Sequence, residues 1–149
     1  MNSNKQRGNS FEREMCDLLA ANGFWAHNFA QNRDGQPADI IAVKFYFHSL
    51  IDCKLITNRN EGFPLSRWEE NQRMSMALFH SRGWYQSYLA LKLPDGTIRM
   101  VGAATLLGLE SKGKHSIPFN DISKYTMRFD EWLGVVYEAN RRWLSPNAL

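Results

Sequence analysis

Two short apolar segments that carry acidic residues constrain the fold of this chain more than any other feature. Residues 38–43 and 50–54 are apolar apart from Asp39 in the first segment and Asp52 and Lys54 in the second, and both predict β-strands. Strand side chains alternate between two faces, so Asp52 and Lys54 point the same way while Cys53 points the other way. The pattern predicts two carboxylates and an ammonium group on neighbouring strands.

Helix and hairpin signals place other elements around these strands. Asn9 or Ser10 is expected to cap a first helix that ends at Gly23, and Ser66 with Glu69 forms a capping box for a second helix. Asp-Gly at 95–96 between apolar runs predicts a hairpin. We expect strands at residues 24–29, 38–43, 50–54, 84–93 and 98–101, and helices from 10 to 22, from 67 to about 82 and from 129 to 143. This order predicts an α/β fold with a central mixed sheet flanked by helices. The turn between the two acidic strands falls within residues 44–49.

Length and composition narrow the class of protein. The 149 residues suit a single domain over 1–149. The net charge is only +3, with a pI near 9.0, so any site for a polyanion must be a local basic patch. Cys16 and Cys53 have no disulfide or metal-binding spacing, and no segment has the apolar length of a signal peptide or membrane span. We expect a soluble cytoplasmic protein with no membrane partner.

Paired carboxylates beside a lysine suit metal-assisted cleavage of a phosphodiester. Mg²⁺ lowers the pKa of a bound water and neutralises developing charge, and it takes hard oxygen ligands, usually one or two carboxylates with waters and phosphate. Asp39 and Asp52 would supply these ligands, and Glu12 in the first helix is a third candidate, direct or through water. Lys54 would hold the attacking water or stabilise the pentacovalent phosphate. Mn²⁺ is expected to substitute for Mg²⁺.

Several motifs follow one another in the first half of the chain. They are Arg7-Gly8-x-x-Phe11-Glu12, Pro37-x-Asp39-Ile40-Ile41-Ala42, Asp52-x-Lys54, and Phe63-Pro64-Leu65-Ser66 with Gln72 on the next helix. In this order they resemble the PD-(D/E)xK nuclease superfamily, and within it the Holliday-junction resolvases of the archaeal Hjc type and the bacterial RecU type. The segment from Phe63 to Ser66 with Gln72 is particularly similar to the RecU type. Residues 84–149 carry no matching motif.

The resemblance implies a restriction-endonuclease-like fold and a homodimer acting on branched, four-way DNA. It implies Glu12, Asp39 and Asp52 as metal ligands, Lys54 as the catalytic lysine and Gln72 facing the site. An aspartate stands at Asp52 where these families more often carry glutamate, which keeps the ligand type. The short interval between Asp39 and Asp52 leaves no room for the protruding stalk of cellular RecU-type enzymes, which implies a compact variant of a bacterial cell or of a phage.

Each acid also has an ordinary structural explanation. Glu12 would favour the first turn of a helix whatever its function, Asp39 could simply begin a strand, and Asp52 with Lys54 could be a solvent-facing ion pair of little energetic weight. Taken alone, Asp39 is better explained as a turn residue, although an acid in an otherwise apolar strand is costly to bury without a partner. The apolar neighbours of Asp52 favour its functional interpretation.

Six basic residues are candidate phosphate contacts that would position DNA without reading its bases. They are Lys5, Arg7, Arg33, Arg59, Arg67 and Arg73. The leading hypothesis is therefore a metal-dependent endonuclease that resolves Holliday junctions in recombination and repair. The alternatives are another DNA endonuclease of the same fold, of restriction, nicking or repair type, and a non-catalytic DNA-binding module.

Overall fold

The computed structural model describes residues 4–29, 35–83 and 85–144 and has a mixed α/β architecture. The helices are α1 (Asn4–Ala21), α2 (Glu70–Gly83), α3 (Ala103–Ser111), α4 (Ile122–Tyr125) and α5 (Phe129–Arg141). The strands of the main sheet are β1 (Trp25–Asn28), β2 (Ile40–Lys44), β3 (Phe47–Leu55), β5 (Tyr88–Lys92), β6 (Ile98–Gly102) and β8 (Met127–Arg128). Two short strands, β4 (Phe63–Pro64) and β7 (Ser116–Ile117), and two 3₁₀ turns, η1 (Leu65–Arg67) and η2 (Phe119–Asp121), complete the described elements.

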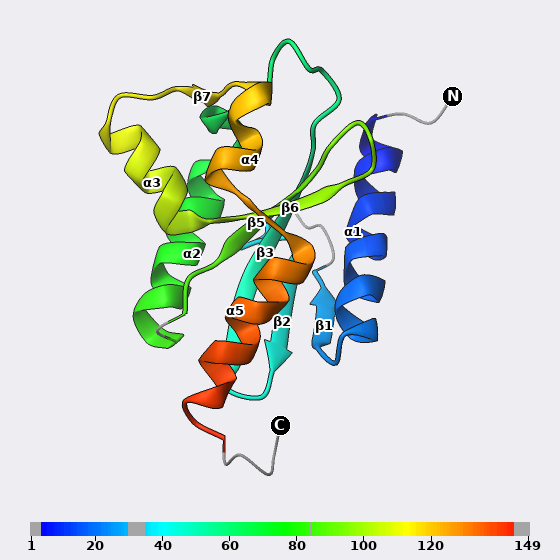
Figure 1. The fold of residues 1–149 in the computed structure, drawn as a ribbon, viewed down its shortest axis with the longest axis vertical. Coiled ribbons are helices and arrows are strands. Elements are labelled where there is room, and N and C mark those ends of the chain that lie inside the picture. Colours follow the sequence, from blue (N-terminus) through cyan, green and yellow to red (C-terminus); the bar gives the residue numbers. More distant parts are fainter. Residues whose placement is uncertain (1–3, 30–34, 84, 145–149) are drawn as a thin grey trace.

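The main sheet is mixed, as the sequence predicts. Its strand order is β1-β2-β3-β5-β6-β8, with β3 parallel to β5 and the other neighbouring pairs antiparallel. The parallel pair requires a crossover connection, and the segment that contains α2 supplies it (Figure 1). The central strand β3 therefore pairs with β2 on one side and with β5 on the other. Its polar residues Ser49 and Asp52 are buried.

Helices cover both faces of this sheet (Figure 1). On one face, α1 and α5 share an apolar cluster with the strands that includes Phe11, Met15 and Trp132. On the other face, α2 and α3 pack through Met76 and Leu106. Within the described part of the chain, no helix is both long and apolar enough to cross a membrane.

The hairpin of β2 and β3 is held at its closed end. The strands turn at Phe45 and Tyr46, and Phe45 has a φ of 54°, a left-handed conformation that is uncommon for a bulky side chain. The buried Asn140 of α5 fixes this turn: its Oδ1 accepts the N–H groups of Tyr46 (2.9 Å) and Phe47 (3.1 Å), and its Nδ2 donates to the carbonyl of Lys44 (2.9 Å). Because the closed end of the hairpin is held in this way, the position of its open end, which carries the acids, is also restricted.

The predicted start of the first helix is wrong. α1 begins at Asn4, so Asn9 and Ser10 lie inside the helix rather than at its cap. Residues 4–9 contain good helix formers such as Lys5 and Arg7, which extend the helix backwards. The expected strand at 84–93 is shorter, as β5, and α3 and α4 lie in a stretch where the sequence pattern predicts no element.

The predicted capping box of the second helix is displaced by three residues. Ser66 lies in the 3₁₀ turn η1, and α2 begins at Glu70. The Oε1 atom of Gln72 accepts the backbone N–H of Glu69 at 3.2 Å, which is the return half of a capping box between Glu69 and Gln72. This shift fixes the orientation of Gln72 relative to the sheet.

Candidate active site

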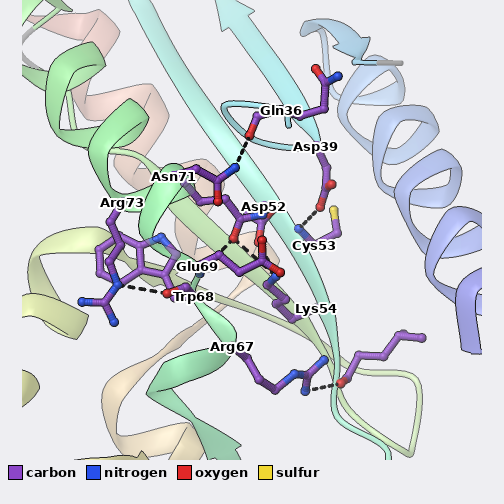
Figure 2. A network of polar contacts seen from close by, with 12 residues as sticks. Gln36, Asp39, Asp52, Cys53, Lys54, Arg67, Trp68, Glu69, Asn71 and Arg73 are labelled. Atoms are coloured by element: carbon purple, nitrogen blue, oxygen red, sulfur yellow. Dashed lines mark hydrogen bonds and ion pairs between the residues drawn. The ribbon is translucent and has the colours of Figure 1, made fainter. Parts of the chain in front are cut away.

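The open end of the β2–β3 hairpin brings Asp39 and Asp52 together. Ile40 pairs with Ile51 across the antiparallel ladder, so continuing the register by one residue sets Asp39 opposite Asp52. Asp39 immediately precedes β2, and its Oδ2 atom accepts the backbone N–H of Cys53 at 2.7 Å. This bond anchors the Asp39 carboxylate to the strand that carries Asp52 (Figure 2).

Asp52 is completely buried, and each of its carboxylate oxygens has a different neighbour. Gln72 on α2 donates from Nε2 to Asp52 Oδ1 at 2.8 Å, and Lys54 Nζ lies 2.9 Å from Asp52 Oδ2. Lys54 also donates to Gln72 Oε1 at 3.4 Å. The ion pair confirms that Asp52 and Lys54 share one face of β3, on the side covered by α2 (Figure 2). Cys53 packs with the opposite cluster, also as expected.

Glu12 joins this group from α1. Burial, and then the charge of Asp39, raise the pKa of Glu12 to about 7. Burial, and then Asp39, raise the pKa of Asp52 well above its usual range, while Lys54 opposes this rise. Three carboxyl groups and one ammonium therefore interact at one place, as the sequence indicated. Asn28 at the end of β1 lowers the pKa of Glu12 and so belongs to the surroundings of this group, and no sequence signal pointed to it.

The residues present fit a small divalent cation. Asp39 and Asp52 offer hard carboxylate oxygens, and buried Asp52 Oδ2 receives no well-directed hydrogen bond even though Lys54 is close. Across the described ranges, no group of three acidic, histidine or cysteine side chains forms a ready-made metal shell. Mg²⁺ needs only one or two carboxylates and keeps several waters, so the aspartate pair suffices, with Glu12 able to act through water.

Two of the predicted DNA contacts have structural partners instead of free guanidinium groups. Arg73 donates to the carbonyls of Trp68 (2.9 Å) and Leu65 (3.3 Å), forms a bidentate pair with Glu110 of α3 and lies 4.7 Å from the centre of the Trp68 ring. Arg67 donates to the carbonyl of Leu55 at 2.7 Å. Arg73 therefore joins α2, α3 and the segment before α2.

The other predicted DNA contacts are on the surface. Lys5 and Arg7 are exposed on the N-terminal part of α1, which also carries Glu12. Arg59 is exposed in the loop after β3, with its guanidinium 5.4 Å from the centre of the Phe119 ring. Arg33 lies outside the described residues. Lys5, Arg7 and Arg59 are thus accessible to a ligand.

The sequence suggested Gln72 only through the family resemblance. A local sequence signal for Gln72 does exist: residues 69–72 have the Glu-x-x-Gln pattern of a capping box. It lies three residues after the predicted box of Ser66 and Glu69. A further link is Asn71, whose Nδ2 donates to the Gln36 carbonyl at 3.2 Å and connects α2 to the segment before Asp39 (Figure 2). Partners this distant in sequence, such as Gln72 and Asp52, follow only from the tertiary arrangement.

An acid at the start of one strand, an acid and a lysine two residues apart on the next, and a mixed sheet between helices define a metal-dependent nuclease of the PD-(D/E)xK type. Comparison with known proteins gives the family. The model of the archaeal Holliday junction resolvase (Hjc) family matches residues 3–133, and the chain belongs to this family. It is a resolvase, an endonuclease that requires a divalent metal and acts on four-way DNA junctions.

A solved structure supports the same assignment. The chain is similar to Hjc of Archaeoglobus fulgidus, a Holliday junction resolvase from an archaeal hyperthermophile, with a TM-score of 0.53 and 25% sequence identity. The match covers 66% of this chain and 78% of the archaeal one. No sequence among the curated proteins compared matches the chain.

Proposed function

We propose that this resolvase cuts its junction at a Mg²⁺ site formed by Asp39 and Asp52, with Glu12 as a further ligand, direct or through water, and with Mn²⁺ able to replace Mg²⁺. The observation that carries the proposal is the interaction of Glu12, Asp39, Asp52 and Lys54 at the open end of one hairpin. A bound Mg²⁺ would supply charge neutralisation and an acidified water. Three mutually repelling carboxyl groups form a site that favours a cation.

Within this proposal, the chain's own residues position the reacting groups. Lys54, held between Asp52 Oδ2 and Gln72 Oε1, places an ammonium beside the site of phosphate attack. Gln72 donates to Asp52 Oδ1, so Asp52 Oδ2, which lies 2.9 Å from Lys54 Nζ, is the oxygen left for a cation. Gln72 thus orients both the acid and the lysine from α2, which supports its predicted role at the site.

Cleavage of an immobile four-way junction tests this proposal. With Mg²⁺ or Mn²⁺ we expect junction cleavage far above that of linear duplex or single strands, and none with EDTA. Asp52→Asn should lower cleavage by about 100-fold or more while junction binding persists. Asp17→Asn, which changes an exposed acid on the same helix as Glu12, is the matched control and should cut normally. Equal cutting of linear DNA would contradict the resolvase assignment, and inert wild type with both cations would favour a non-catalytic module.

We further propose that the protein acts as a homodimer, because two cuts on opposing strands need two sites related by symmetry. A cavity of about 1220 Å³ lies between α2, α3 and α5 and is lined mainly by apolar side chains. Its edge includes the exposed residues Met74, Leu107 and Trp143, which are 65%, 50% and 56% exposed. Patches of this kind mark interaction surfaces.

The groove also contains buried polar groups without partners. Ser87 Oγ and Trp68 Nε1 line it, and neither has a hydrogen-bond partner within the described chain. Glu131 and Glu138 of α5 and His80 of α2 are among the residues that line the groove. A two-fold axis at this groove would bring its exposed apolar residues against those of the other copy.

Leu107→Glu tests the groove as the dimer contact, and Leu78→Glu is the matched control because Leu78 is exposed but does not line the groove. By analytical ultracentrifugation we expect dimers for wild type and Leu78→Glu and monomers for Leu107→Glu. The monomer should nick one strand of the junction without a coordinated second cut. A Leu107→Glu protein that remained dimeric would refute this interface.

Residues 1–149 are proposed to form a single nuclease domain, which the family match over most of the chain supports. We place its action in the cytoplasm of a bacterial cell or a phage-infected host. The two cysteines, Cys16 and Cys53, are both free thiols, which suits a reducing compartment.

A further inference from the structure

A second, smaller cavity lies beyond the carboxyl end of β3, next to the acidic cluster. Its volume is about 420 Å³. Three segments line it: α1 through Arg7 and Ser10, the end of β3 with the residues after it, and the turn between β5 and β6. None of the four residues of the acidic and lysine cluster belongs to its lining. It is therefore a neighbour of the candidate active site and not a part of it.

The walls of this cavity are fixed by main-chain hydrogen bonds. Ile56 donates its N–H to the Lys92 carbonyl at 2.8 Å, which extends the pairing of β3 and β5 past the strand ends. The turn is closed by Leu93 N–H to the Thr97 carbonyl at 2.8 Å and by Gly96 N–H to the Leu93 carbonyl at 2.9 Å. The cavity is thus preformed, as ligand pockets usually are.

The lining suits a nucleotide of a DNA strand. Arg7 and Lys92 are basic, no acidic side chain lines the cavity, and Ser10 and Thr57 add hydroxyl groups. Arg7 is exposed and can reach a phosphate, whereas Lys92 is paired with Glu14 and lies over the Phe11 ring. The other lining residues are apolar and are Phe11, Leu55, Ile56, Leu93, Pro94 and Gly96. A nucleotide would match both the polar and the apolar part of the lining, with its phosphate at Arg7 and its sugar or base against the apolar wall.

The position of the cavity fits the spacing of a strand held at the active site. Arg7 precedes Glu12 by five helical residues, or about 7.5 Å along α1. Thr57 follows Lys54 by three residues, or about 10 Å along an extended chain. Stacked DNA rises about 3.4 Å per nucleotide along each strand, so these distances correspond to about two or three nucleotides.

We propose that this pocket receives an unstacked nucleotide of the cut strand, about two or three positions from the scissile phosphate. A concave pocket between three protein segments cannot admit a base that remains stacked in a duplex. Displacing a base is least costly where pairing or stacking is already interrupted, and a branch point is such a place. The pocket would thereby add selectivity for branched over linear DNA. The inference rests on the proposed cleavage site and adds the element that recognises the branch.

Filling the pocket tests the inference directly. Ser10→Trp places a large side chain at the wall, and Asn9→Trp is the matched control, because Asn9 is exposed on the same helix but does not line the cavity. Thr57→Trp fills the pocket from the opposite wall and serves if Ser10→Trp does not fold. The substrate is an immobile four-way junction with 2-aminopurine at single positions around the cut site, bound in Ca²⁺ so that it stays intact.

Wild type and Asn9→Trp should increase 2-aminopurine fluorescence at one position about two or three nucleotides from the cut. Ser10→Trp and Thr57→Trp should abolish this increase and lower the ratio of junction to linear-duplex cleavage in Mg²⁺ by about 10-fold or more. Folded Ser10→Trp or Thr57→Trp protein that keeps the fluorescence increase and the cleavage preference would overturn the pocket assignment. Wild type that does not cut the junction at all would instead overturn the proposed function.

Discussion

Replacing Glu12 with Gln should change how the stability of the metal-free protein depends on pH. The folded protein raises the pKa of Glu12 from 4.5 to about 7, first through burial and then through the negative charge of Asp39. Between these two values the folded chain keeps a proton that the unfolded chain has released. The free energy of unfolding therefore falls as pH rises through this window, and Glu12→Gln removes this contribution.

The size of the effect follows from the pKa shift, reduced for solvent. A rise of this extent in a fully buried group would correspond to roughly 3 kcal/mol at pH 8. Glu12 is only partly buried, so water screens the repulsion and we expect about 1 kcal/mol. Glu12→Gln should match wild type near pH 4.5 and exceed it by about 1 kcal/mol at pH 8. In a domain of this size, that difference raises the melting temperature by about 2–4 °C.

Urea unfolding of both proteins in EDTA, from pH 4.5 to pH 8, measures this difference. Glu14→Gln on the same helix is the control, because Glu14 pairs with Lys92 and is not among the groups that shift the pKa of Glu12. Calorimetry of Mg²⁺ binding at pH 7 in buffers of different ionisation enthalpy gives an independent readout. Wild type should release a proton as the cation binds, and Glu12→Gln should release less. Parallel stability curves for wild type and Glu12→Gln would refute the idea that the cluster holds a shared excess of negative charge.

Three further substitutions separate structural from DNA-binding roles. Arg73→Gln removes the contacts to Glu110 and should lower the free energy of unfolding by about 1–2 kcal/mol in urea. If Arg73 does not touch DNA, the salt dependence of junction binding should be unchanged. Arg59→Ala should show the opposite pattern, with normal stability but a salt slope of junction binding that is shallower by about 0.9 for each phosphate that the protein no longer neutralises. Asn140→Ala should lower the free energy of unfolding by about 2–4 kcal/mol, because it leaves the Tyr46 and Phe47 N–H groups without their acceptor. A destabilisation below about 1 kcal/mol would contradict the role of Asn140 in fixing the β2–β3 turn.

The features that the sequence predicts correctly are those set by local periodicity. Alternation along residues 50–54 places Asp52 and Lys54 on one face, and Asp-Gly at 95–96 marks the turn between β5 and β6. The limits of elements were less predictable, because helix formers before Asn9 extend α1 and two possible capping boxes overlap at Glu69. Sequence alone could not choose between these boxes, since the choice depends on the contact of Gln72 on α2 with Asp52 on β3.

Pairings between distant segments lay beyond local reasoning. Nothing near Asn140 indicates that it closes the β2–β3 turn, and nothing near Arg73 indicates Glu110 as its partner. The interpretation of Arg73 as a DNA contact rested on its position near the expected site, which is also where it packs against Trp68. A basic residue beside an active site can serve the fold or the ligand, and only its contacts separate the two.

The placement of Asp39 and Asp52 argues against a purely structural role for the two acids. Directly opposite like charges destabilise an antiparallel pair, and the register sets these two acids opposite each other. The ladder ends at Ile40, and the Cys53 N–H, Lys54 and Gln72 offset the repulsion without removing it, since the pKa of Asp52 stays well above its usual range. A sheet selected for stability alone would not retain this arrangement, and departures from local rules concentrate at functional sites. The residual repulsion is what a divalent cation would relieve, so the same unfavourable electrostatics that weaken the metal-free fold favour metal binding at this end of the hairpin.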